Sequence, residues 1–154
     1  MGPNVELVLL VEDNRTDSWL LQRAFERSGT HVRMLHVANG DDAVAYLRGD
    51  GEYHNRGVFP LPGVVILDLK LPRRSGFEVL QWLRHDSTNL RRLPVVVLSS
   101  SAEPKDVNRA YDLGANSYLQ KPHSSAQFQE LALCFQHYWL GFNEDPSLSR
   151  AALV

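Results

Sequence analysis

The sequence predicts an α/β protein built on a doubly wound, five-stranded parallel sheet with strand order 2-1-3-4-5. Two continuous apolar runs, Leu7–Val11 and Val64–Leu67, are typical of strands buried on both faces, as in parallel sheets. Strand and helix patterns alternate five times along the chain, as in successive β-α units. The strand order follows if the first strand is central and the chain winds first to one side of it and then to the other.

The first half of the chain begins with the 7–11 strand and a helix that Asn14 is placed to cap and Gly29 to end. A short strand at 31–37 and a short helix at 41–48 follow. Residues 49–62 form a 14-residue loop rich in glycine and proline. This loop is longer than most connections in a compact α/β domain, so it is a candidate contact surface.

The second half continues the alternation. After the 64–67 strand, the pattern Ser75-x-x-Glu78 is a capping box that opens the third helix. Pro104 suits the first turn of the fourth helix and Gly114 its end. The remaining predicted elements are strands at 93–98 and 116–120 and a last helix from Ser124 to about Leu140.

Composition excludes several classes of protein. The chain has 154 residues, 44% of them hydrophobic and 22% charged, with a net charge of −2, which suits one globular domain. Basic residues form no stripe, so nucleic-acid binding is not expected. No apolar run is long enough to span a bilayer, and the amino terminus does not resemble a signal peptide. The single cysteine, Cys134, fits a reducing cytoplasm.

Three carboxylates are expected to share one crevice. Glu12 and Asp13 directly follow the first strand, and Asp68 directly follows the third. In the predicted order these strands are neighbours at the switch point of the sheet, where ligands bind. Taken singly, each carboxylate could be no more than a solvated strand end. Together they would repel one another without a cation, and an all-oxygen set of donors favours Mg²⁺.

Two further groups leave the same edge of the sheet: Ser99 after the fourth strand and Lys121 after the fifth. A divalent cation, an ammonium group, a hydroxyl and a carboxylate suit phosphoryl transfer, with Asp68 as the nucleophile. Lys121 and the metal would neutralise charge on the phosphoryl oxygens. Alone, a lysine at a strand end is usually exposed to solvent.

Four motifs together resemble the receiver domain of response regulators in two-component signalling: LLVEDN (9–14), LDLKLPRRSG (67–76), VVVLSSS (95–101) and SYLQKP (117–122). The resemblance implies a flavodoxin-like (β/α)5 receiver domain over 1–142 and a tail at 143–154. It implies that Asp68 is phosphorylated from a phosphohistidine on a sensor histidine kinase, with no enzymatic output. The implied residue roles are Asp13 as direct Mg²⁺ ligand, Glu12, Asp68 and the Lys70 carbonyl as further ligands, Ser99 as switch hydroxyl, Tyr118 as switch aromatic and Lys121 as phosphate lysine. A cis Lys121–Pro122 bond is also implied.

A narrower resemblance connects the chain to stand-alone regulators paired with phytochrome-type histidine kinases. It rests on the 49–62 loop, the segment 69–80 and the segment 135–146. It implies a bacteriophytochrome as the partner kinase. Because only 33 residues follow Lys121, we expect output through a protein contact.

The last helix suggests what that contact is. Leu133 and Leu140, seven residues apart, share a face with Gln129 and Gln136, away from the predicted core stripe. We expect a homodimer formed by this face with the fourth helix and fifth strand, and with the 141–154 tail reaching the partner. The predicted core stripe consists of Phe128, Leu131, Ala132, Phe135, Tyr138, Trp139 and Phe142.

Other functions fit the sequence less well. A phosphohydrolase of the haloacid-dehalogenase class would carry an Asp two residues after the nucleophile, where this chain has Lys70. A flavin or nucleotide carrier would need a phosphate-binding loop after the first strand, where Glu12 and Asp13 stand. A scaffold that works without phosphorylation would lack part of the acidic and lysine set, which is complete here.

Overall fold

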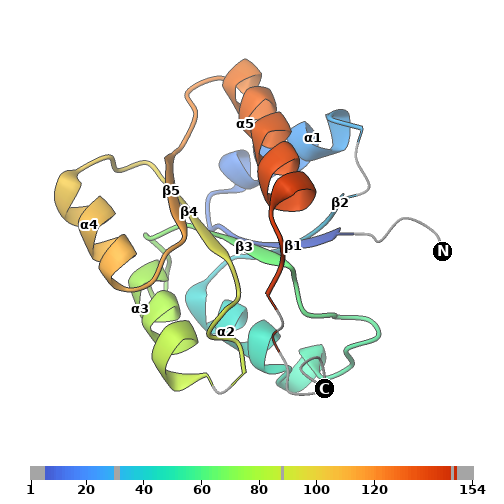
Figure 1. The fold of residues 1–154 in the computed structure, drawn as a ribbon, viewed down its shortest axis with the longest axis vertical. Coiled ribbons are helices and arrows are strands. Elements are labelled where there is room, and N and C mark those ends of the chain that lie inside the picture. The colour runs from blue at the N-terminus through green and yellow to red at the C-terminus, as the bar shows by residue number, and fades with distance from the viewer. Residues whose placement is uncertain (1–5, 30–31, 88, 147, 149–154) are drawn as a thin grey trace.

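The computed structural model describes residues 6–29, 32–87, 89–146 and 148, with the side chain of Glu6 left out. Five strands and five α-helices alternate along the chain (Figure 1). The strands are β1 (Glu6–Val11), β2 (Val32–Val37), β3 (Val64–Leu67), β4 (Val95–Ser99) and β5 (Ser117–Gln120). The helices are α1 (Arg15–Arg27), α2 (Gly40–Arg48), α3 (Gly76–Gln81), α4 (Pro104–Asp112) and α5 (Ser125–His137).

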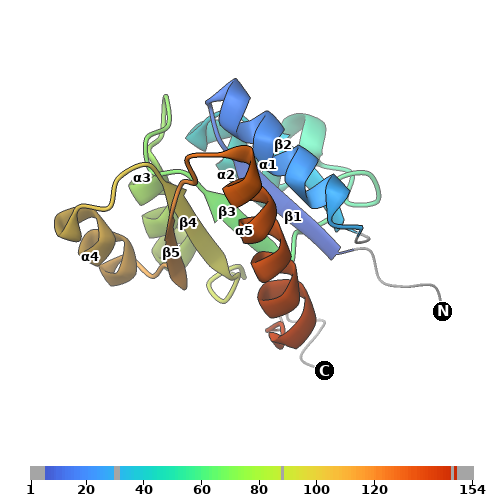
Figure 2. The same ribbon diagram turned by 90° about the horizontal axis from the view of Figure 1, so that it is seen from above.

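All five strands pair in parallel in the order β2-β1-β3-β4-β5, which confirms the predicted topology. Helices α1 and α5 cover one face of the sheet, and α2, α3 and α4 cover the other (Figures 1 and 2). Each face has its own apolar cluster: the first core cluster lies on the side of α2, α3 and α4, and the second on the side of α1 and α5. Strands β3 and β4 are buried at every position, as strands covered on both faces must be.

Local signals place most helix starts correctly. Asn14, Ser75 and Ser124 cap α1, α3 and α5, and each side chain accepts the N–H three residues later. The predicted start of the fourth strand at Leu93 is wrong, since β4 begins at Val95. Pro94 has no N–H to give to a sheet ladder, and it contributes only its carbonyl, which accepts from Val65. The predicted strand start at His31 lies outside the described residues.

The 49–62 loop is packed onto the domain. It contains a 3₁₀ turn at Gly51–Tyr53, and its aromatic side chains Tyr53 and Phe59 lie against Tyr46 of α2. Arg56 donates to the carbonyls of Tyr46 and Leu47, both at 2.8 Å, and so satisfies the carboxyl end of α2. The part of this loop that remains exposed for contact with another molecule includes Val58, which is half exposed.

The end of the last helix differs from the prediction. Tyr138 and Phe142 of the expected core stripe are exposed by 56% and 85%. Tyr138 lies at the edge of the predicted arc, and Phe142 lies in a π-helical turn, Tyr138–Phe142, whose extra residue rotates it out of helical register. Leu133 is 40% exposed as expected, but Leu140 is partly buried against the second core cluster.

Two further observations concern the carboxyl-terminal third of the chain. The described residues contain no cis peptide bond, so Lys121–Pro122 is trans, contrary to the expectation from the resemblance. Leu148 packs against the first core cluster of its own chain, on the opposite face of the sheet from α5.

No helix within the described ranges is both long and apolar enough to cross a membrane.

Candidate functional site

The predicted carboxylate crevice forms at the carboxyl edge of the sheet. Strands β1 and β3 are direct neighbours, and Val11 pairs with Leu67, so the residues that follow each strand emerge together. The Asp68 N–H continues this ladder by donating to the Val11 carbonyl at 3.0 Å. Glu12 and Asp68 are buried, whereas Asp13 is exposed at the mouth of the crevice.

Lys121 supplies the positive charge of the crevice. Its ammonium nitrogen lies 2.7 Å from Glu12 Oε1 and 3.1 Å from Asp68 Oδ2. It lies equally close, 3.1 Å, to Asp17 Oδ2 in the first turn of α1, a partner that the sequence did not indicate. The backbone N–H of Lys121 donates to the Ser99 carbonyl at 2.8 Å, so β4 holds the lysine in line with the other strand ends.

Burial and charge compete at this cluster. Burial raises the pKa of Glu12 from 4.5 to about 7, because the hydrogen bond from Lys121 only partly offsets desolvation and Asp68 adds repulsion. Burial alone would lower the pKa of Lys121, but the hydrogen bond to Glu12 and the charges of Asp68 and Glu12 raise it overall. The crevice therefore retains its ammonium ion and has more negative charge than that ion neutralises.

The donor set fits a hard divalent cation. Glu12, Asp13 and Asp68 each offer a carboxylate oxygen, and the three oxygens lie within 4.8 Å of one another. Oxygen-only donors with few carboxylates and an open, water-facing side suit Mg²⁺ or Mn²⁺. The Lys70 N–H donates weakly to Asp68 Oδ1, at 3.4 Å, which brings the following loop toward the carboxylate. The role of the Lys70 carbonyl as a ligand stays a prediction.

Ser99 and Tyr118 are joined through one residue, Ser101. The Ser101 N–H donates to the buried Ser99 hydroxyl at 3.2 Å, and the Ser101 carbonyl accepts from the Tyr118 hydroxyl at 2.8 Å. The Ser101 hydroxyl also donates to Asp106 in the first turn of α4, at 2.7 Å. The Tyr118 hydroxyl is therefore bound to the β4–α4 loop and is not simply solvated. Any movement of that loop changes the surroundings of both predicted switch residues.

Comparison with known proteins agrees with this geometry. The model of the response regulator receiver domain matches residues 8–132, which is most of the chain. The chain belongs to the response regulator receiver domain family.

Two relatives are similar to this chain over most of their own length. The probable methanogenesis regulatory protein FilR2 of Methanothrix harundinacea is 42% identical over 91% of this chain and 87% of its own. Response regulator Rcp1 of Synechocystis is 35% identical over 88% of this chain and 89% of its own.

Solved structures show the same fold. The phosphorylated cyanobacterial phytochrome response regulator RcpA superposes with a TM-score of 0.85 at 36% identity, over 93% of this chain and 99% of its own. The Mn²⁺-bound form of Rcp1 gives a TM-score of 0.82 at 34% identity, over 92% and 99%. Both the fold class and the family resemblance predicted from the sequence are thus confirmed.

Proposed function

We propose that this receiver domain accepts a phosphoryl group on Asp68 from a phosphohistidine of a sensor histidine kinase. One observation carries the proposal: a buried carboxylate at the switch point of the sheet lies 3.1 Å from an ammonium nitrogen, beside two more carboxylates. A carboxylate oxygen of Asp68 attacks phosphorus as the bond from phosphorus to the histidine nitrogen breaks, and that nitrogen takes the electron pair. Lys121 stabilises the phosphoryl oxygens by charge.

Glu12, Asp13 and Asp68, with the Lys70 carbonyl, would hold Mg²⁺ in this proposal. The bound ion would supply charge neutralisation between Asp68 and the incoming phosphoryl group. The Mn²⁺-bound form of Rcp1 supports a divalent cation in a related protein.

Incubation with acetyl phosphate and Mg²⁺ tests the phosphoryl step without a kinase. We expect the protein to gain one acid-stable, base-labile phosphate and Asp68→Asn to gain none, because an amide is not a nucleophile toward phosphorus. Asp50→Asn is the control, since Asp50 is exposed at the surface outside the site and pairs with Arg48. Undiminished uptake by Asp68→Asn, or none by the wild type, would refute the proposal.

The partner kinase that we propose is of the phytochrome type. Two similar proteins support it: RcpA is a cyanobacterial phytochrome response regulator, and RPA3017, which is 32% identical, is a response regulator in red light signalling of R. palustris. Phosphotransfer profiling against several kinases checks this: a phytochrome kinase should phosphorylate Asp68 fastest, and a clear preference for another class would contradict the idea.

We further propose that phosphorylation is read at the surface formed by α4, β5 and α5. In this proposal Ser99 moves toward a phosphoryl oxygen. Because the main chain of Ser101 is hydrogen-bonded to both Ser99 and Tyr118, and its side chain to the first turn of α4, this movement shifts the Tyr118 hydroxyl and that turn. In the Ser99→Ala variant, Asp68 should still be phosphorylated, but the NMR shift changes on α4 and β5 should shrink. Ser100→Ala, one residue along and exposed, is the control; an equal response in Ser99→Ala and wild type rules the coupling out.

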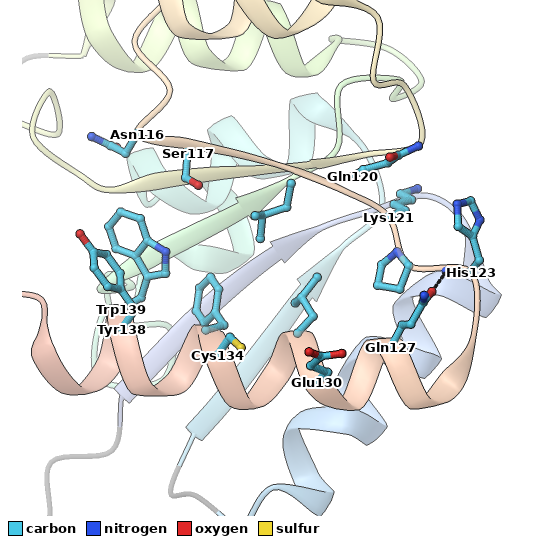
Figure 3. Close-up of a pocket in the computed structure, with 14 residues that line it drawn as sticks. Asn116, Ser117, Gln120, Lys121, His123, Gln127, Glu130, Cys134, Tyr138 and Trp139 are labelled. Atoms are coloured by element: carbon cyan, nitrogen blue, oxygen red, sulfur yellow. Dashed lines mark hydrogen bonds between the residues drawn. The ribbon is translucent and has the colours of Figure 1, made fainter.

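The homodimer that we propose uses the same surface. Between β5 and α5 lies a groove of about 700 Å³, lined by apolar side chains and by polar ones that include Lys121, His123 and Glu130 (Figure 3). Tyr138, exposed by 56%, lies at its rim, and Tyr111 of α4 is exposed by 48%. The apolar members of the lining are Leu119, Pro122, Leu131, Cys134, Phe135 and Trp139.

Light scattering tests this pairing. We expect a dimer that Tyr138→Glu weakens, because a charge would be buried in the interface. Trp19→Glu is the matched control, since Trp19 is exposed to the same extent, 56%, and belongs to α1, outside the surface formed by α4, β5 and α5. A monomer at high protein concentration, with and without a phosphate analogue, would disprove the dimer.

A further inference from the structure

The side chain of Asp17, in the first turn of α1, contacts Lys121 and not the N–H of the residue that caps its own helix. It stands three residues after the capping residue Asn14, and its N–H donates to Asn14 Oδ1 at 3.0 Å. A Glu or Gln side chain at this position can reach back to the N–H of the capping residue. Here the Asn14 N–H donates instead to Glu12 Oε2 at 3.2 Å, and the Asp17 carboxylate reaches across to Lys121.

Lys121 has three N–H donors and three carboxylate partners. Two of these partners, Glu12 and Asp68, belong to the residues that would hold Mg²⁺, and Asp68 would also carry the phosphoryl group. Asp17 has neither of these roles, because it lies outside the cluster of metal-binding oxygens and its carboxylate contacts the site through Lys121.

The position of Asp17 also differs from those of the other two carboxylates. The side chain of Asp17 is 27% exposed, whereas those of Glu12 and Asp68 are 3% and 7% exposed. Asp17 therefore approaches the ammonium group of Lys121 from the solvent side. A carboxylate there can keep the lysine in the crevice without entering the space that a cation or a phosphoryl group would occupy.

We propose that Asp17 is a positioning residue for Lys121, the one anchor that keeps the ammonium group over the crevice when Mg²⁺ and the phosphoryl group engage Glu12 and Asp68. Its part in phosphoryl transfer rests on the proposed function, but its hold on Lys121 does not. Without Asp17, a lysine displaced from Glu12 and Asp68 by these groups has no fixed carboxylate partner among the described residues and samples solvent. The lysine is then in place less often when phosphorus is attacked.

The direct test is the NMR signal of the lysine ammonium group in the Mg²⁺-saturated protein. The chain has three lysines, and Lys105 is 79% exposed, so a protected ammonium signal can be assigned to Lys121 with a Lys121→Arg sample. We expect a slowly exchanging Lys121 signal in the wild type and its loss to fast exchange in Asp17→Asn. Asp17→Glu should restore it, because it restores the charge.

Asp41→Asn is the matched control: Asp41 also lies in the first turn of a helix and pairs with a cation, Arg74 at 3.4 Å, outside the site. It should leave the Lys121 signal unchanged. The rate of phosphorylation by acetyl phosphate should fall about fivefold in Asp17→Asn, the effect of losing one partly exposed ion pair, and recover in Asp17→Glu.

The outcomes of these experiments distinguish the positioning role of Asp17 from the proposed phosphoryl transfer to Asp68. An unchanged Lys121 signal in Asp17→Asn overturns the positioning role, whether or not the protein takes up phosphate. Loss of the signal with an unchanged phosphorylation rate overturns the part of Asp17 in the transfer step. Absence of phosphate uptake by the wild type refutes the proposed function, and the NMR result then decides the hold on Lys121 by itself.

Discussion

Replacing Lys121 with methionine is expected to lower the free energy of unfolding by about 3 kcal/mol at pH 8 in the absence of divalent metal. Methionine keeps much of the volume of lysine but removes the only cation in contact with Glu12 and Asp68 among the described residues. Both carboxylates are almost fully buried, so their charges would be left facing one another in a poorly solvated crevice.

The loss should depend on pH in a definite direction. The pKa of Glu12 is raised from 4.5 to about 7 in the folded protein, so the native state binds this proton more tightly than the unfolded chain does. Stability contributed by that proton is therefore lost as pH rises from about 5 through 7. Lys121 lowers the pKa of Glu12 and so stabilises its charged form. Removing Lys121 should therefore reduce the free energy of unfolding less at pH 5, where Glu12 can take a proton, than at pH 8.

Urea unfolding at the two pH values, with and without Mg²⁺, measures these effects. Mg²⁺ should restore part of the lost stability of Lys121→Met at pH 8, because it binds the same carboxylates. Lys105→Met is the control: the Lys105–Glu103 pair is exposed on both sides, and its loss should change stability by at most about 0.5 kcal/mol. Equal losses for the two variants would show that the crevice charges are already neutralised in another way.

The main-chain frame of the site could be predicted from the sequence because it follows from periodicity and topology. Continuous apolar runs identify β1, β3 and β4 as buried parallel strands, and only a few strand orders connect five β-α units. Once β1 and β3 are neighbours, the residues after them must emerge side by side. The prediction that Glu12, Asp13 and Asp68 form one group is therefore correct, and Lys121 joins them as expected.

The details that escaped prediction depend on competition between local and distant partners. A first-turn Asp such as Asp17 normally stays with its own helix, and only the donation of the Asn14 N–H to Glu12 leaves it free for a lysine 104 residues away. Ser101 joins Ser99 to Tyr118 through main-chain groups, which side-chain patterns do not reveal. The π-helical turn after α5 likewise breaks a regular 3.6-residue period that the sequence itself continues.

Gly76→Ala is expected to destabilise the protein by about 3 kcal/mol and to distort the site at the same time. Gly76 is the first residue of α3, and its N–H donates to the Leu69 carbonyl at 2.9 Å. A Cβ added there would overlap the carbonyl oxygen of Asp68 and lie 2.7 Å from the Cα of Leu69. These are backbone atoms, so the clash cannot be relieved by a rotamer change and must push α3 and the Asp68 loop apart.

The strain should therefore be visible in function as well as in stability. Chemical denaturation should give the loss of unfolding free energy, and both Mg²⁺ binding and phosphate uptake from acetyl phosphate should weaken, because Asp68 carries the displaced carbonyl. Gly141→Ala is the matched control, since its added Cβ would meet only the Gln136 carbonyl at an ordinary 3.4 Å. That variant should stay within about 0.5 kcal/mol of wild type. If Gly76→Ala instead kept full stability and full phosphate uptake, the close approach of α3 to the phosphoacceptor loop could not be what fixes the position of Asp68.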